Sequence, residues 1–131
     1  MIHLDTNLLV DLVTVGSPGG RQIALWLSAG VRIGASAVAW SEFCNGPLTR
    51  AQKDSAFAAL NREIHDFTWR TAENAARLFN LNGRKRGSHA DCMIAATAMQ
   101  EGASLATFNT LDFIRLIPFG VVLEPMDLTT Q

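Results

Sequence analysis

The 131-residue sequence has few of the features that mark zinc-binding, exported or membrane proteins. It contains only two cysteines, Cys44 and Cys92, without the paired spacing of a zinc site, and both are expected to be small core residues of a reduced protein. No apolar run reaches the ~20 residues that a membrane span requires, and no basic segment leads into an apolar core near the start. We therefore expect a cytoplasmic protein with no membrane partner.

The sequence also lacks an excess of positive charge. Its 11 Lys and Arg are offset by 12 Asp and Glu, which gives a formal net charge of -1. Bulk charge therefore does not attract the phosphate backbone of a nucleic acid. This balance still permits a nuclease whose acids are gathered at one site and screened by a divalent metal ion.

Short apolar strands alternate with amphipathic helices along the chain. The length and the hydrophobic fraction of 48% fit a single domain over residues 1–131. The pattern predicts strands before Asp5 and at 31–34, 64–67, 103–107 and 119–123, helices over 21–29, 36–43, 49–61, 71–79 and 88–99, and a polar tail over 127–131. This alternation favours an α/β fold with a mainly parallel sheet of four to five strands, covered on both faces.

Three acids stand at positions that such a sheet brings together. Asp5 comes just past the first strand, and the carboxyl ends of strands are where open parallel sheets bind ligands. Glu42 lies on the predicted helix 36–43, on a largely apolar stripe where an unpaired carboxylate costs free energy. Asp91 falls in the first turn of the helix that begins near Ser88. Together, these acids indicate a functional site.

Each acid taken alone also has a structural interpretation. Ser88 and Asp91 stand three residues apart, as in a capping box with Asp in place of Glu, and an acid there suits the helix dipole. Glu42 fits an ordinary glutamate on a helix surface. Asp112, after the fourth strand, either adds a fourth charge or begins a short helix as its N-cap. Thr6 fits a residue that orients Asp5, or a helix cap.

Three short motifs occur in a characteristic order: Leu-Asp-Thr-Asn at 4–7, Ser-Glu-Phe at 41–43 and Ala-Asp-Cys-Met-Ile-Ala-Ala at 90–96. This ordered set resembles the PIN-domain nucleases, and among them the VapC-type toxins of bacterial toxin–antitoxin pairs. The resemblance runs from residue 2 to about residue 122. It implies a PIN-like three-layer α/β/α fold and metal-dependent cleavage of RNA that leaves a 5'-phosphate and a 3'-hydroxyl. It also implies a homodimer and a cognate antitoxin that covers the acidic site.

The acids then take definite roles. Asp5, Glu42, Asp91 and Asp112 are the candidate catalytic residues. Oxygen-only ligands select a hard cation, Mg²⁺ or alternatively Mn²⁺. We assign Asp5 and Asp91 as direct metal ligands and Glu42 as a water-mediated ligand or general base. Asn109 stands where many relatives have Asp, and because an amide binds metal more weakly, Asp112 is the candidate to supply the missing charge.

The densest basic cluster, Gly83-Arg84-Lys85-Arg86-Gly87, comes immediately before the helix of Asp91. Its three cations, Arg84, Lys85 and Arg86, are predicted to contact phosphates on either side of the cut site, which positions a substrate without reading its sequence. The alternative is a solvated surface loop. Adjacency to Asp91 favours the binding role.

The three histidines show no ligand pattern of their own. His3 and His65 fall in predicted strands, whereas His89 lies beside the predicted acidic site. No pair has the spacing of metal ligands, so we interpret all three as structural residues.

Two other functions fit acids on such a sheet. A phosphatase requires a second Asp two residues after the first, where this chain has Asn7, and a receiver domain requires a lysine late in the chain, whereas none follows Lys85. A PIN-like scaffold that binds RNA or protein without cutting is favoured by one feature only, Asn109. The nuclease interpretation therefore leads.

Overall fold

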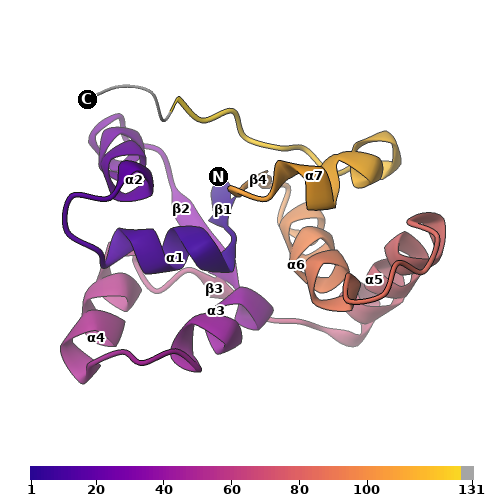
Figure 1. Ribbon diagram of the computed structural model, residues 1–131, viewed down its shortest axis with the longest axis horizontal. Helices are drawn as coiled ribbons and strands as arrows, with labels where there is room; N and C mark the ends of the chain where they lie inside the picture. Colours follow the sequence, from indigo (N-terminus) through magenta and orange to yellow (C-terminus); the bar gives the residue numbers. More distant parts are fainter. Residues whose placement is uncertain (128–131) are drawn as a thin grey trace.

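The computed structural model describes residues 1–127 (Figure 1). Its four strands are β1 (Ile2–Leu4), β2 (Ile33–Ser36), β3 (Ile64–His65) and β4 (Ser104–Ala106). They form an all-parallel sheet in the order β3-β2-β1-β4. The predicted parallel sheet is confirmed with four strands. Of the predicted polar tail, residues 128–131 lie outside the described residues.

Helices cover both faces of the sheet, as the α/β alternation predicts. They are α1 (Thr6–Leu12), α2 (Pro18–Ser28), α3 (Ala37–Cys44), α4 (Arg50–Ala59), α5 (Trp69–Leu81), α6 (His89–Gln100), α7 (Thr110–Phe113) and the 3-10 helix η1 (Ile114–Phe119). Figure 1 shows α1 to α4 on one side of the strands and α5 and α6 on the other, which is the three-layer α/β/α arrangement. Within residues 1–127, no helix is long and apolar enough to cross a membrane.

Several boundaries differ from the sequence prediction; for example, α2 begins at Pro18 rather than Arg21. Helix α5 begins earlier than expected, because Thr68 rather than Thr71 is its N-cap and accepts the amide N–H of Thr71 at 3.2 Å. The predicted strand at 119–123 is replaced by η1 and a single bridge between Leu105 and Leu123. Helix η1 ends at Gly120, whose φ of +111° suits a residue without a side chain. A loop therefore borders β4 where a fifth strand was predicted.

Packing in the core fixes the positions of both ends of α6. Strands β1 and β2 are buried along their whole length, which is why they read as continuous apolar runs. Helix α6 packs against α5 and the sheet through the buried small residues Cys92, Ala95, Ala96 and Ala98. This packing fixes the axis of α6, with Asp91 in its first turn and Glu101 as its C-cap.

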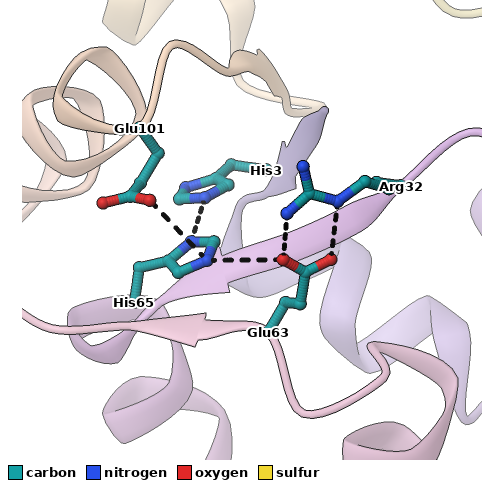
Figure 2. Close-up of polar contacts among 5 residues, drawn as sticks. All are labelled: His3, Arg32, Glu63, His65 and Glu101. Atoms are coloured by element: carbon teal, nitrogen blue, oxygen red, sulfur yellow. Dashed lines mark hydrogen bonds and ion pairs between the residues drawn. The ribbon is translucent and has the colours of Figure 1, made fainter.

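A polar network joins three residues that precede β2, β3 and β4 to the histidines of β1 and β3 (Figure 2). The guanidinium group of Arg32, just before β2, donates from Nε and Nη2 to both carboxylate oxygens of Glu63, just before β3. His65 Nε2 lies 3.8 Å from a carboxylate oxygen of Glu63 and 3.8 Å from one of Glu101, and His65 Nδ1 lies 2.7 Å from His3 Nε2. We call these five residues the amino-edge network. In this network the Glu63 carboxylate is hydrogen-bonded to Arg32, and the Glu101 carboxylate lies beside the His65 ring.

Candidate active site

The carboxyl ends of β1 and β4 hold Asp5 in place. Its amide N–H donates to the carbonyl of Ala106, the last residue of β4, at 2.9 Å. Its carboxylate is the N-cap of α1 and accepts the amide of Thr6 at 2.8 Å, while the other oxygen accepts the hydroxyl of Thr107 at 2.7 Å. Asp5 is only 5% exposed, so these bonds fix the direction in which its oxygens point.

Thr107 is a site residue that was not predicted from the sequence. This residue follows β4 directly, as Asp5 follows β1, and it is 1% exposed. Besides donating to Asp5, its hydroxyl accepts the amide of Asn109 at 2.9 Å. The available signal was a hydroxyl residue just past the carboxyl end of a parallel strand, the same signal that selected Asp5.

Glu42 lies on α3 and is exposed, so the argument from an apolar stripe was wrong. One of its carboxylate oxygens accepts the hydroxyl of Thr6 at 2.6 Å. Thr6 therefore contacts two of the predicted acids, because its amide donates to Asp5 and its hydroxyl to Glu42. The first residue of α1 ties the acid after β1 to the acid on α3.

Asp91 does not form the capping box that its position allows. Ser88 is the N-cap of α6, but its hydroxyl donates to the carbonyl of Lys85 at 2.7 Å and makes no side-chain cap bond to the helix. The capping box considered for Ser88 and Asp91 is therefore absent from α6. Asp91 is half-buried in the first turn of the helix.

Asp112 lies within α7, and its N-cap interpretation was wrong. The N-cap of α7 is Asn109, which makes no side-chain cap bond, and the amide of Asp112 donates to the carbonyl of Asn109 at 3.0 Å. The Asp112 side chain is 43% exposed and lies 3.6 Å from Lys85 Nζ. Asp112 therefore brings a fourth carboxylate to this edge of the sheet.

The four acids Asp5, Glu42, Asp91 and Asp112, here called the acidic cluster, influence one another electrostatically. Burial raises the pKa of Asp91 to about 6, and the charges of Asp5, Asp112 and Glu42 add to the rise, whereas Lys85 opposes it. Burial also raises the pKa of Asp5, against the hydrogen bonds from Thr107 and Thr6. Carboxylates that raise each other's pKa are close enough to repel.

This donor set fits a hard divalent cation, because it is made of carboxylate oxygens whose repulsion a bound cation relieves. Within residues 1–127 no three Asp, Glu, His or Cys side chains are already grouped as a metal site. Asp5 is buried and accepts two hydrogen bonds, whereas Glu42 and Asp112 lie on helices and are partly or fully exposed. The oxygen donors of the cluster therefore suit a hard cation, and its outer side chains have room to move.

The similarity to a known protein family extends over most of the chain and is not confined to the acidic cluster. Residues 2–116 match the PIN domain family, a span that includes all four acids. The chain belongs to the PIN domain family. PIN domains are generally nucleases that use divalent metal ions, which agrees with the donor set of the acidic cluster.

Solved structures resemble this PIN domain over nearly its whole length. FitAcB from Neisseria gonorrhoeae has a TM-score of 0.73 and 23% identity, with 100% of both chains covered. VapBC2 from Rickettsia felis, bound to a DNA fragment from its promoter, has a TM-score of 0.72 and 24% identity, covering 97% of this chain and 100% of that one. A toxin–antitoxin complex from Klebsiella pneumoniae has a TM-score of 0.69 and 25% identity, covering 86% and 90%. No functionally curated protein is significantly similar in sequence.

The three cations of the basic loop are held differently in the PIN domain. Arg84 has a φ of +55°, and its guanidinium group lies 5.1 Å from the ring centroid of Phe79 and donates to the side chain of Asn80. Lys85 lies beside Asp112, as described above. Arg86 is exposed. The loop therefore presents one cation packed on α5, one at the acidic cluster and one toward solvent.

His89 lies at the start of α6, between the basic loop and the acidic cluster in sequence. It is exposed, and its ring packs against Phe79 with 5.4 Å between the ring centroids. His89 and Arg84 thus share one aromatic neighbour.

Proposed function

We propose that this PIN domain is a metal-dependent endoribonuclease, the toxin of a type II toxin–antitoxin pair that a cognate antitoxin neutralises. One observation carries the proposal: four acids gather beyond the carboxyl ends of β1 and β4, where burial and then the charges of Asp5, Asp112 and Glu42 raise the pKa of Asp91 to about 6. Folding that assembles mutually repelling acids costs stability unless a ligand compensates. In a family of nucleases, the compensating ligand is a divalent cation.

Asp5 and Asp91 would hold the ion directly, and Mg²⁺ or Mn²⁺ suits their oxygens. When bound, such an ion lowers the pKa of a water molecule and stabilises charge on the leaving oxygen of a phosphodiester. Thr107 and the amide of Thr6 orient Asp5 through the bonds at 2.7 and 2.8 Å. These bonds keep a nearly buried carboxylate directed toward the substrate side.

Glu42 is suited to a different task from Asp5, because it is exposed and can exchange protons with water. The Thr6 hydroxyl holds one of its oxygens and leaves the other available. We assign Glu42 as general base or water-mediated ligand, and Asp112 as the fourth carboxylate. Thr6 thereby sets the relative position of the first ligand and the base.

The substrate is proposed to be RNA, held by Arg84, Lys85 and Arg86 through its phosphates. Contacts to phosphates position a strand without reading its sequence. The basic loop leads directly into α6, and Lys85 lies beside Asp112 at the acidic cluster. Hydrolysis would leave a 5'-phosphate and a 3'-hydroxyl.

The toxin assignment is supported by the solved relatives, among them VapBC2 and the Klebsiella pneumoniae toxin–antitoxin complex. An unrestrained ribonuclease harms its own cell, so an inhibitor protein is required. An antitoxin arginine paired with Asp5 or Asp91 would place a guanidinium group where the cation binds. We also propose a homodimer, as the resemblance to VapC-type toxins implies.

A catalytically weak scaffold is the second candidate. Asn109 in place of an acid favours it, as does the finding that the described residues hold no preassembled group of three metal ligands. Such a scaffold would bind RNA or protein and leave RNA intact. The two candidates differ in a single outcome, cleavage.

The test is incubation of purified protein with a pool of structured and single-stranded RNAs, with Mg²⁺, with Mn²⁺ and with chelator. We expect cutting with either ion, none with chelator, and none by Asp91→Asn. Asp54→Asn is the matched control, because Asp54 is an exposed acid on α4 that pairs with Arg50. Binding of RNA without cutting would support the scaffold. Cutting that persists in chelator or in Asp91→Asn would refute the proposed mechanism.

A further inference from the structure

Lys85 is attached to the start of α6 by its own backbone. Its carbonyl accepts both the amide of Ser88 at 3.1 Å and the hydroxyl of Ser88 at 2.7 Å. The neighbouring residues Arg84 and Gly87 have φ values of +55° and +84°, so the loop turns sharply on both sides of Lys85. The Ser88 hydroxyl is used to hold Lys85 rather than to cap the helix. The base of the Lys85 side chain is therefore fixed relative to Asp91, three residues after Ser88.

The Lys85 side chain faces the acidic cluster. Its Nζ lies 3.6 Å from a carboxylate oxygen of Asp112, and its charge opposes the rise in the pKa of Asp91. Arg84, the preceding cation, instead packs on Phe79 and bonds to Asn80. Lys85 is thus the cation of the basic loop that is placed to neutralise the acids.

The pair of Lys85 and Asp112 is not a rigid structural bridge. The two side chains are 54% and 43% exposed, and an exposed pair of this kind contributes little to stability by itself. A flexible lysine whose backbone is fixed can move its ammonium group over several ångströms without moving the loop. This combination suits a counter-ion that is held in place and can be displaced.

On the basis of the proposed metal-dependent function, we propose that Lys85 is a built-in counter-ion of the acidic cluster. In the metal-free protein it partly neutralises the carboxylates, and it competes with the divalent cation for them. When a cation binds, the ammonium group leaves Asp112 and becomes available to a phosphate of the RNA. Lys85 is therefore a positioning residue that links an occupied metal site to substrate binding.

The first test is calorimetric titration of the metal-free protein with Mn²⁺. Removing one positive charge a few ångströms from a divalent ion changes its affinity by roughly three- to tenfold at moderate ionic strength. We expect Lys85→Gln to bind Mn²⁺ tighter by that factor and Lys85→Arg to bind as the wild type does. Arg50→Gln is the matched control, because it removes the same charge from an exposed pair, with Asp54 at 3.4 Å, on α4. Equal affinity in Lys85→Gln and Arg50→Gln would overturn the competition.

The second test is thermal unfolding in chelator, which needs no bound metal. We expect Lys85→Gln to lower the melting temperature by roughly 2–4 °C, the difference to become smaller in an Asp112→Asn background, and Lys85→Arg to restore the wild-type value. The difference should vanish at saturating Mn²⁺, because the ion then supplies the charge. No change in the melting temperature in chelator would overturn the counter-ion role.

Failure of this inference can be told from failure of the proposed function. If the wild type binds Mn²⁺ and cuts RNA but Lys85→Gln shows neither tighter binding nor lower stability, only the counter-ion is wrong. If neither protein binds Mn²⁺, the competition and the metal-dependent function both fall, and unfolding in chelator still decides whether Lys85 neutralises the acids.

Discussion

The two edges of the sheet treat their acids in opposite ways. At the amino edge, Glu63 accepts two hydrogen bonds from Arg32, and this guanidinium group lowers the pKa of Glu63 (Figure 2). At the carboxyl edge, burial and neighbouring carboxylates raise the pKa of Asp91 to about 6, with Lys85 as the opposing cation. Acids whose charge is satisfied within the chain have a structural role. Acids that repel one another carry charge that a cation can stabilise.

Helix α6 connects the two edges and provides an internal comparison. Asp91 lies in its first turn and Glu101 is its C-cap. Glu101 lies 3.8 Å from His65 Nε2, whereas Asp91 faces three further carboxylates. The same helix thus carries one acid beside a histidine and one among carboxylates, so Asp91 and Glu101 are suited to paired mutation.

The largest difference between these two acids should appear in catalysis. We expect Asp91→Asn to lower kcat by on the order of 10²–10⁴-fold, because it removes a proposed ligand of the ion that activates water and stabilises the leaving group. Glu101→Gln should change kcat by less than about twofold, as a residue remote from the reacting atoms. Single-turnover cleavage of an RNA that the wild type cuts would measure both. Equal losses in the two variants would remove the distinction between the edges.

Thr107 is expected to affect metal affinity through its hydrogen bond to Asp5. Replacing it by Val removes the 2.7 Å hydrogen bond to a nearly buried carboxylate, and loss of such an orienting bond lowers metal affinity by roughly 10–100-fold. Thr107→Ser keeps the hydroxyl and should bind nearly as the wild type does. Mn²⁺ titration of the two variants provides the comparison. If Val and Ser behave alike, the hydroxyl does not orient Asp5.

Stability of the metal-free protein should respond to Asp91 in a pH-dependent way. The folded-state pKa of Asp91 is raised from 3.8 to about 6, so ionisation of Asp91 opposes folding. The free energy of unfolding is therefore highest with respect to this group below about pH 4, and it falls as the pH rises toward 6. Asp91→Asn should therefore be more stable than the wild type at pH 7, by about 1–2 kcal/mol after allowance for partial exposure. The gain should disappear below about pH 4. Urea unfolding in chelator across this range would detect it, and a destabilised variant at pH 7 would contradict it.

Glu63 should show the opposite sign and the smallest effect. Its folded-state pKa is lowered by Arg32, so its contribution is present above the unfolded-state pKa and is lost as the pH falls. Glu63→Gln should destabilise the protein at pH 7 by at most about 1 kcal/mol, because the Arg32 side chain is largely exposed. The same urea experiment gives the value. A stabilised Glu63→Gln variant would show that the amino edge also carries unsatisfied charge.

The elements that a local sequence pattern specifies were predicted correctly. The strands at 2–4 and 104–106 and the helices around Glu42 and Asp91 follow from apolar periodicity, and the position of Asp5 follows from the end of β1. The predicted fifth strand failed because η1 and a single bridge at Leu123 take its place, and an apolar run of five residues does not distinguish these outcomes.

The contacts that complete the site join residues far apart in the chain. Thr107 and Asp5 are 102 positions apart, and Thr6 and Glu42 are 36 apart. Such pairs depend on the strand order and on helix packing, and a local sequence pattern predicts neither. Ser88 illustrates the same limit at short range, because its hydroxyl had two possible partners and bonded to Lys85 rather than to the helix.

The most direct test of the account is calorimetric titration of the metal-free wild type, Asp91→Asn and Glu101→Gln with Mn²⁺ at pH 7. The account predicts binding by the wild type, unchanged binding by Glu101→Gln, and loss of binding by Asp91→Asn. Binding that survives in Asp91→Asn, or is lost in Glu101→Gln instead, would contradict the claim that the repelling acids at the carboxyl edge form the cation site.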